Sequence, residues 1–238
     1  MVKRTFTANS HAVVARLTSI ADPERQLALS YAPMDARPAL GALFTLDETL
    51  GAILSGGREP TLRQIRLAWW HEALTRLDQT APPPQPLLQA LAAHVLPRGV
   101  TGAALASMID GWDLVIDPDP IPAAALARYA EARGGRLFTA AGRMLASAND
   151  PIDAAGQGWA LVDLACRTSD AALAAEARAI AAPLLEMATA PRWSKAGRPI
   201  GMLAVLARID CRAAPGTQRR QGSPQRVGRM MWHGLTGR

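Results

Sequence analysis

The sequence predicts an all-α fold, a single antiparallel bundle of helices, and three observations support this. Alanine-rich segments in which apolar residues recur every three or four positions make up most of the chain. No run of β-branched or aromatic residues alternates with a period of two, so no strand is expected. Proline and glycine clusters, such as the one at residues 81–86, divide the chain into pieces of helical length. The 238 residues fit one domain, and no linker divides them.

The first helices are predicted from their caps and breakers. Residues 1–21 form a basic N-terminal arm that lacks a continuous apolar region, so a secretory signal is not expected. Asp22 precedes Pro23 at the first helical position, which favours a helix that ends before Pro33. Asp35 can cap a second helix, which continues to about Leu54.

The helix from Thr61 to Leu77 is predicted to be the central packing element. Thr61 and Gln64 have the spacing of a capping box. Two neighbouring apolar rows follow, one of Leu62, Ile65, Trp69, Ala73 and Leu77 and the other of Leu67, Trp70 and Leu74. A stripe this wide, with two adjacent tryptophans, predicts buried contacts on more than one side of the helix.

Periodicity predicts the remaining helices at residues 87–96, 101–116, 123–145, 151–167, 170–187, 199–212 and 224–235. Arg133-Gly134-Gly135 interrupts the 123–145 segment, and the two glycines favour a bend or a close helix contact there. Residues 213–224 are expected to form a loop before the last helix.

Three segments carry a family resemblance through their order and spacing: DPERQLALSYAP at residues 22–33, RPALGAL at 37–43 and IRLAWWHEAL at 65–74. Further segments extend it, namely MIDGWDL at 108–114, RYAE at 128–131, RPIGMLA at 198–204 and SPQR at 223–226. They resemble the squalene/phytoene synthase family, and most closely its divergent bacterial branch and the related mitochondrial complex I assembly factor with a phytoene-synthase-like domain. The resemblance implies the isoprenoid-synthase fold, an antiparallel helical bundle around a central cavity.

Enzymes of that family join two prenyl diphosphates, and the resemblance implies magnesium ions held by carboxylates on facing helices. The region of the first acidic motif contains only Asp47 and Glu48. Because these two are adjacent, they point about 100° apart around the helix. In the second region Arg167 matches the arginine of the family's N-x-x-R-D segment, but Thr168 follows it in place of aspartate. Both acidic motifs are therefore depleted.

Other acids offer only partial replacements. Asp163 and Asp170 are two turns apart, roughly 10 Å along a helix, too far to share one ion. Asp110 and Asp113 are one turn apart, which suits a metal, although a polar helix end explains them equally. If the chain is an enzyme, the candidate catalytic residues are Asp47, Glu48 and Asp163, and the candidate magnesium ligands are Asp47, Asp110, Asp113 and Asp163.

A separate set of residues is predicted to bind phosphate. Arginine donates paired hydrogen bonds to phosphate oxygens. The candidate diphosphate-binding residues, given the resemblance, are Arg37, Arg63, Arg66, Tyr129 and Arg167. A structural ion pair would explain Arg66 equally well.

Two functions stay open at this point. The depleted motifs favour a prenyl- or lipid-binding or assembly-type protein over an ordinary condensing enzyme. The alternative is an active prenyl-diphosphate transferase that uses rearranged carboxylates, with magnesium as its cofactor.

The charge distribution and the cysteine content indicate which partners and which compartment to expect. Residues 192–238 carry ten Lys or Arg and one acid, Asp210, so an anionic membrane surface, a diphosphate or simply solvent could face this segment. Nucleic acid is not expected, because Trp193 and Trp232 are the only aromatic residues there, and a protein partner stays open. The two cysteines, Cys166 and Cys211, form no disulfide framework, which favours the cytoplasm. No apolar run is long enough to span a membrane, so contact with an inner membrane would be peripheral.

Overall fold

The computed structural model describes residues 20–55, 59–116, 121–214 and 216–238, so the predicted N-terminal arm lies almost wholly outside the described residues. Every regular element in the described part is helical, which confirms the all-α prediction. The α-helices are α2 (Pro23–Tyr31), α3 (Arg37–Ser55), α4 (Pro60–Arg76), α5 (Pro86–Ala90), α6 (Gly102–Ala106), α7 (Ile109–Asp113), α8 (Ala123–Tyr129), α9 (Arg136–Met144), α10 (Ile152–Arg167), α11 (Ala171–Thr189), α12 (Arg198–Arg212) and α13 (Pro224–Thr236). Two π-helical segments, η1 (Leu91–Val95) and η3 (Ala130–Gly135), and a short 3₁₀ helix, η2 (Leu96–Arg98), complete the set.

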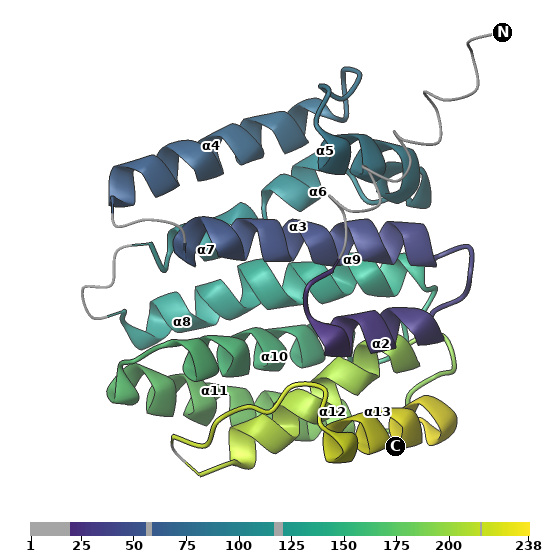
Figure 1. The fold of residues 1–238 in the computed structure, drawn as a ribbon, viewed down its shortest axis with the longest axis vertical. Helices are drawn as coiled ribbons and strands as arrows, with labels where there is room; N and C mark the ends of the chain where they lie inside the picture. Colours follow the sequence, from purple (N-terminus) through teal and green to yellow (C-terminus); the bar gives the residue numbers. More distant parts are fainter. Residues whose placement is uncertain (1–19, 56–58, 117–120, 215) are drawn as a thin grey trace, which may run out of the picture.

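The long helices form successive rows, from α4 at one end of the molecule to α12 and α13 at the other (Figure 1). The middle rows are α3, the continuous rod α8–η3–α9, and α10. α10 contacts η3 and α9 as well as α11 and α12. The candidate site lies among these middle rows, because their side chains meet in the interior.

α4 is the outermost row, and the prediction that it is the central packing element is wrong (Figure 1). Its contacts are with α3, α6 and α7, and the row of Leu67, Trp70 and Leu74 is buried against them, joined at the C-terminal end by Leu77 of the other row. The other row is largely outside the core: Leu62 is 51%, Ile65 60% and Trp69 47% exposed. A wide apolar stripe therefore does not by itself establish burial on two sides.

The predicted start of α4 is also displaced. The helix begins at Pro60, with Glu59 at the N-cap and no capping side-chain hydrogen bond, so the Thr61 capping box does not form. Proline suits the first helical position because its missing N–H would have no helical partner there.

Two further segments differ from their predictions. The helix expected over 101–116 divides at Ser107 and Met108 into α6 and α7. The 123–145 segment, expected to break at Arg133, instead continues through η3. A π-helical segment inserts extra residues per turn and so changes the direction of the side chains that follow.

The close helix contact expected at the glycines of 134–135 is present. A Cβ on Gly134 would lie 2.0 Å from the Gly156 carbonyl oxygen, and one on Gly156 would lie 2.1 Å from that of Gly134. Only glycine permits this approach of η3 to α10. It brings the preceding residue, Arg133, into the interior, where it is 1% exposed.

Candidate functional site

Asp47 lies on α3 with its carboxylate buried beneath two arginines. Arg133 donates from Nε to Oδ1 at 3.0 Å and from Nη2 to Oδ2 at 3.1 Å. Arg25, on α2, donates from Nη2 to Oδ2 at 2.7 Å. Both carboxylate oxygens are therefore occupied by guanidinium donors, in a paired geometry that suits arginine and carboxylate.

Asp163, on α10, faces the same guanidinium from the other side. Arg133 Nη1 lies 2.9 Å from Asp163 Oδ2. Arg167 Nε donates to that oxygen at 3.0 Å, and Arg219 Nη1 donates to Oδ1 at 3.2 Å. Arg133 thus bridges Asp47 and Asp163, the carboxylates of the two regions where the family resemblance implies magnesium motifs.

The alternation of charges continues to the last helix. Arg219 Nε lies 2.9 Å from Asp210 Oδ2, and Arg226 pairs with Asp210 in turn. Arg226 also contacts Glu24 of α2, with Nη2 and Oε2 2.8 Å apart. An ion-pair chain therefore joins α2, α3, α10, α12 and α13, and its members are Arg25, Asp47, Arg133, Asp163, Arg219, Asp210, Arg226 and Glu24.

Aromatic rings enclose the central guanidinium. Arg133 Cζ is 4.0 Å from the centroid of the Trp112 ring and 4.8 Å from that of Trp159. Its Nη1 donates to the Tyr129 hydroxyl at 2.6 Å. Ring faces attract a cation, and more strongly in a desolvated site.

The ionisation of these groups follows from burial opposed by opposite charge. Burial alone raises the pKa of Asp47 and of Asp163, but the neighbouring arginines outweigh it and hold both values below the ordinary 3.8. Burial lowers the pKa of Arg133, but Asp47, Tyr129 and Asp163 outweigh it and raise the pKa well above its ordinary value. Burial, opposed by Arg133, raises the pKa of Tyr129 to about 12. All four keep their ordinary protonation states at neutral pH.

These residues do not fit a magnesium site. Magnesium takes oxygen ligands in octahedral geometry, and the oxygens of Asp47 and Asp163 already accept from guanidinium groups that cannot deprotonate. Across the described ranges, no group of three or more His, Cys, Asp or Glu side chains is placed to hold a metal ion.

Of the other predicted acids, Glu48 lies beside Asp47, 3.8 Å from Arg25 Nη1, whereas Asp110 and Asp113 lie apart on α7. Glu48 accepts hydrogen bonds from the backbone N–H groups of Ala21 and Asp22, at 2.7 and 3.2 Å, and so anchors the segment before α2. Asp110 is exposed on α7 and pairs with Arg136 at 3.2 Å, and Asp113 is exposed on the same helix. The structure does not gather the acids of the rearranged-carboxylate alternative around one point.

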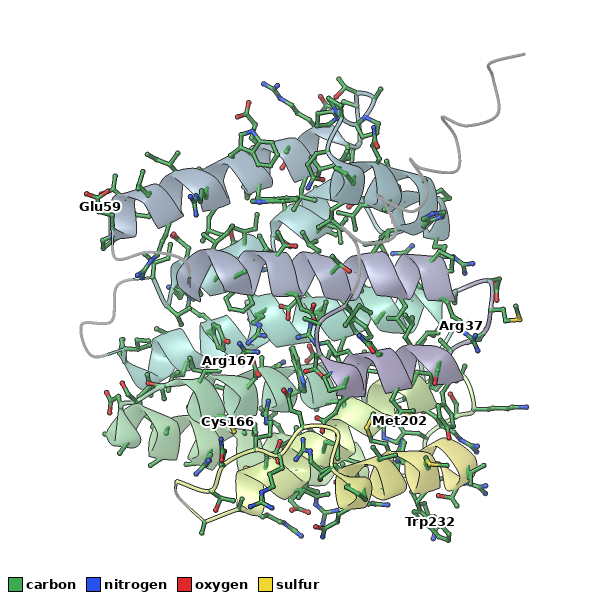
Figure 2. All side chains as sticks on the ribbon, viewed as in Figure 1. Arg37, Glu59, Cys166, Arg167, Met202 and Trp232 are labelled. Atoms are coloured by element: carbon green, nitrogen blue, oxygen red, sulfur yellow. The ribbon has the colours of Figure 1, made fainter. Side chains whose placement is uncertain are left out.

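The predicted phosphate-binding residues are likewise scattered. Arg37 donates to the carbonyl oxygens of Ala32 and Ser30 and so closes the end of α2, far from Arg167 (Figure 2). Arg63 donates to the Ile116 carbonyl at 3.4 Å, and Arg66 is exposed on α4. Of the five, only Arg167 lines the cavity beside Asp47, and Tyr129 is buried as a partner of Arg133.

That cavity has a volume of about 480 Å³. It is lined by the start of α2, the middle of α3 and Trp112 of α7, with Arg167 and Gln221 at its edge. Its charged lining comprises three arginines, Arg25, Arg133 and Arg167, and three acids, Asp22, Asp47 and Glu48. The formal charges of this lining therefore sum to zero.

Sequence reasoning missed the two arginines that define this site. Arg25 belongs to the DPER segment that carried the resemblance, where an unassigned charged residue in a motif was the available signal. Arg133 follows Tyr129 by four residues, one helical turn, and precedes the glycine pair. Its bond to Asp47 spans 86 positions, which local spacing does not reveal.

Acidification is expected to weaken the fold through these carboxylates. Because the folded pKa values of Asp47 and Asp163 lie below the ordinary 3.8, the unfolded chain binds protons more readily. Their stabilisation is fully present at neutral pH and is lost as the pH falls below about 4. Urea unfolding over a pH series measures this. Asp163→Asn should flatten the dependence in that range, and an equally steep dependence in that variant would contradict the assignment.

Comparisons with known proteins agree with this architecture. The squalene/phytoene synthase family model matches residues 20–169. A crystal structure of a dehydrosqualene synthase in complex with ligand superposes with a TM-score of 0.71 at 13% sequence identity, covering 96% of this chain and 97% of that one. No curated protein sequence matches the chain. The matched region includes α2, α3 and α10, which hold Arg25, Asp47 and Asp163, and the chain therefore belongs to the squalene/phytoene synthase family.

Proposed function

We propose that this chain is a non-condensing member of the family that acts as a prenyl- or lipid-binding or assembly-type protein. The observation that carries the proposal is the capture of Asp47 and Asp163 by Arg133, with Arg25, Arg167 and Arg219 completing their coordination. A condensing site needs carboxylates free to hold magnesium against a diphosphate leaving group. Here arginine side chains supply the positive charge, and their ion pairs with Asp47 and Asp163 hold them in position.

Loading magnesium would require Arg133 to leave its buried position. Arg133 would then lose both of its carboxylate partners and would need another place for its charge. The formal charges of the cavity lining sum to zero, so the lining offers no excess positive charge to hold a free diphosphate.

Pyrophosphate release tests the proposal directly. Purified full-length chain, incubated with farnesyl or geranylgeranyl diphosphate and magnesium, is expected to release no pyrophosphate above the protein-free rate. Magnesium-dependent release would support the alternative, a transferase with rearranged carboxylates. Asp113→Asn then serves as the discriminating variant, because Asp113 is exposed and its loss should leave the fold intact. A more than tenfold fall in release in that variant would assign it as a ligand.

A further inference from the structure

A second and larger cavity lies at the opposite end of the ion-pair chain, between α12, the 216–223 segment and α13. Its volume is about 780 Å³. Arg178 of α11 lines it from one side, and Arg220 and Arg229 line it from the segment before α13 and from α13 itself. We call it the C-terminal groove.

The groove holds more positive charge than its acids neutralise. Asp210 is its one acidic lining residue, and it pairs with Arg219 and Arg226. Within the described part of the chain, Arg178 and Arg220 form no ion pair with Asp or Glu, and Arg229 donates from Nη1 to the Arg238 oxygen at 3.0 Å. This imbalance contrasts with the charge-balanced cavity beside Asp47.

Arg178 has one donor without an acceptor. Its Nε is shielded from solvent and has no hydrogen-bond partner among the described residues. Buried donors are nearly always paired, so an unpaired guanidinium nitrogen on a groove wall is available to an acceptor supplied from outside the chain. Phosphate oxygens suit arginine donors best.

An apolar edge runs beside these arginines. Trp232 lines the groove, is 58% exposed and projects from α13 at the margin of the molecule (Figure 2). Leu235, one turn further on, is 69% exposed, and Met231 is 44% exposed. Tryptophan beside basic residues is the composition found where proteins meet the membrane–water interface. No helix in the described ranges is long and apolar enough to cross a membrane.

We propose that the C-terminal groove binds the phosphate headgroup of an anionic phospholipid at a membrane surface. Arg178, Arg220 and Arg229 contact the phosphate, and Trp232 and Leu235 enter the interfacial layer. Single-stranded nucleic acid fits less well, because Trp232 is the one aromatic side chain in the groove and successive bases need several. The inference rests on residues outside the Asp47–Asp163 site and stands or falls independently of the proposed function.

Vesicle co-sedimentation with the full chain tests it. The chain is expected to bind vesicles of phosphatidylcholine with phosphatidylglycerol, to bind pure phosphatidylcholine vesicles weakly, and to dissociate as salt is added. Each arginine near an anionic surface contributes about 1 kcal/mol, so Arg178→Gln with Arg220→Gln should weaken vesicle binding roughly 25-fold. Neither side chain forms an ion pair with another described residue, so the variant should fold, and its urea unfolding midpoint verifies this.

A matched double variant distinguishes binding at the C-terminal groove from attraction by the overall positive charge of the chain. Arg128→Gln with Arg143→Gln removes two exposed arginines from α8 and α9 and should change binding less than about twofold. Trp232→Ala should weaken binding without changing its salt dependence. Three results would overturn the proposal: equal binding to neutral vesicles, equal loss in the two double variants, or tighter binding to a single-stranded oligonucleotide that the groove variant abolishes.

Discussion

Replacing Arg133 by methionine is expected to lower the free energy of unfolding by about 3–5 kcal/mol at neutral pH. Methionine fills much of the space beside Trp112 but leaves Asp47 and Asp163 without their shared counterion in the interior. The loss should shrink below about pH 4, where protonation of the two carboxylates removes the unpaired charge. Urea unfolding at both pH values measures it.

Arg167→Met is the matched control. Arg167 pairs with the same Asp163 oxygen, but its side chain is 61% exposed, so solvent weakens the interaction. Its loss should cost less than about 1 kcal/mol. Equal costs for the two variants would contradict the bridging role of Arg133.

Gly134→Ala is expected to destabilise the fold by about 3 kcal/mol or more. The added Cβ would lie 2.0 Å from the Gly156 carbonyl oxygen and 2.7 Å from the Ala160 Cβ, so η3 and α10 would have to separate. That separation would also withdraw Arg133 from its carboxylates.

Gly228→Ala, inside α13, is expected to stabilise the fold instead. No atom lies within 4 Å of a Cβ built at Gly228, and alanine favours the helix, so stability should rise by about 0.5–1 kcal/mol. Thermal or urea unfolding of the two variants compares them. Similar effects at both glycines would show that the helix contact at Gly134 is not required.

The fold could be predicted from the sequence because its signals are local. Helical periodicity, proline and glycine breakers and the order of the resemblance segments all lie within short stretches, and the close contact at Gly134 followed from its composition. The placement of α4 could not be predicted in this way. Its two apolar rows are similar in sequence, and which of them is buried depends on neighbours such as α6.

The candidate site was predicted only in part. Asp47 and Asp163 were predicted as candidate catalytic residues and magnesium ligands, and Arg167 as a candidate diphosphate-binding residue. Their partner Arg133 was missed because a π-helical segment determines its direction. The pairing also joins positions far apart in the chain, and Arg226 and Glu24 are separated by 202 residues. Such pairs become visible only when the helices are packed.

We propose that arginine takes the place of magnesium at Asp47 and Asp163. Ligand binding measured with and without magnesium tests this most directly. Calorimetry would measure the affinity of the full chain for farnesyl thiodiphosphate, a substrate analogue that resists ionisation, in magnesium and in a chelator. Because Arg133 already occupies both carboxylates, magnesium is expected not to tighten binding. Binding that requires magnesium, and that disappears in Asp163→Asn while the variant stays folded, would contradict the account.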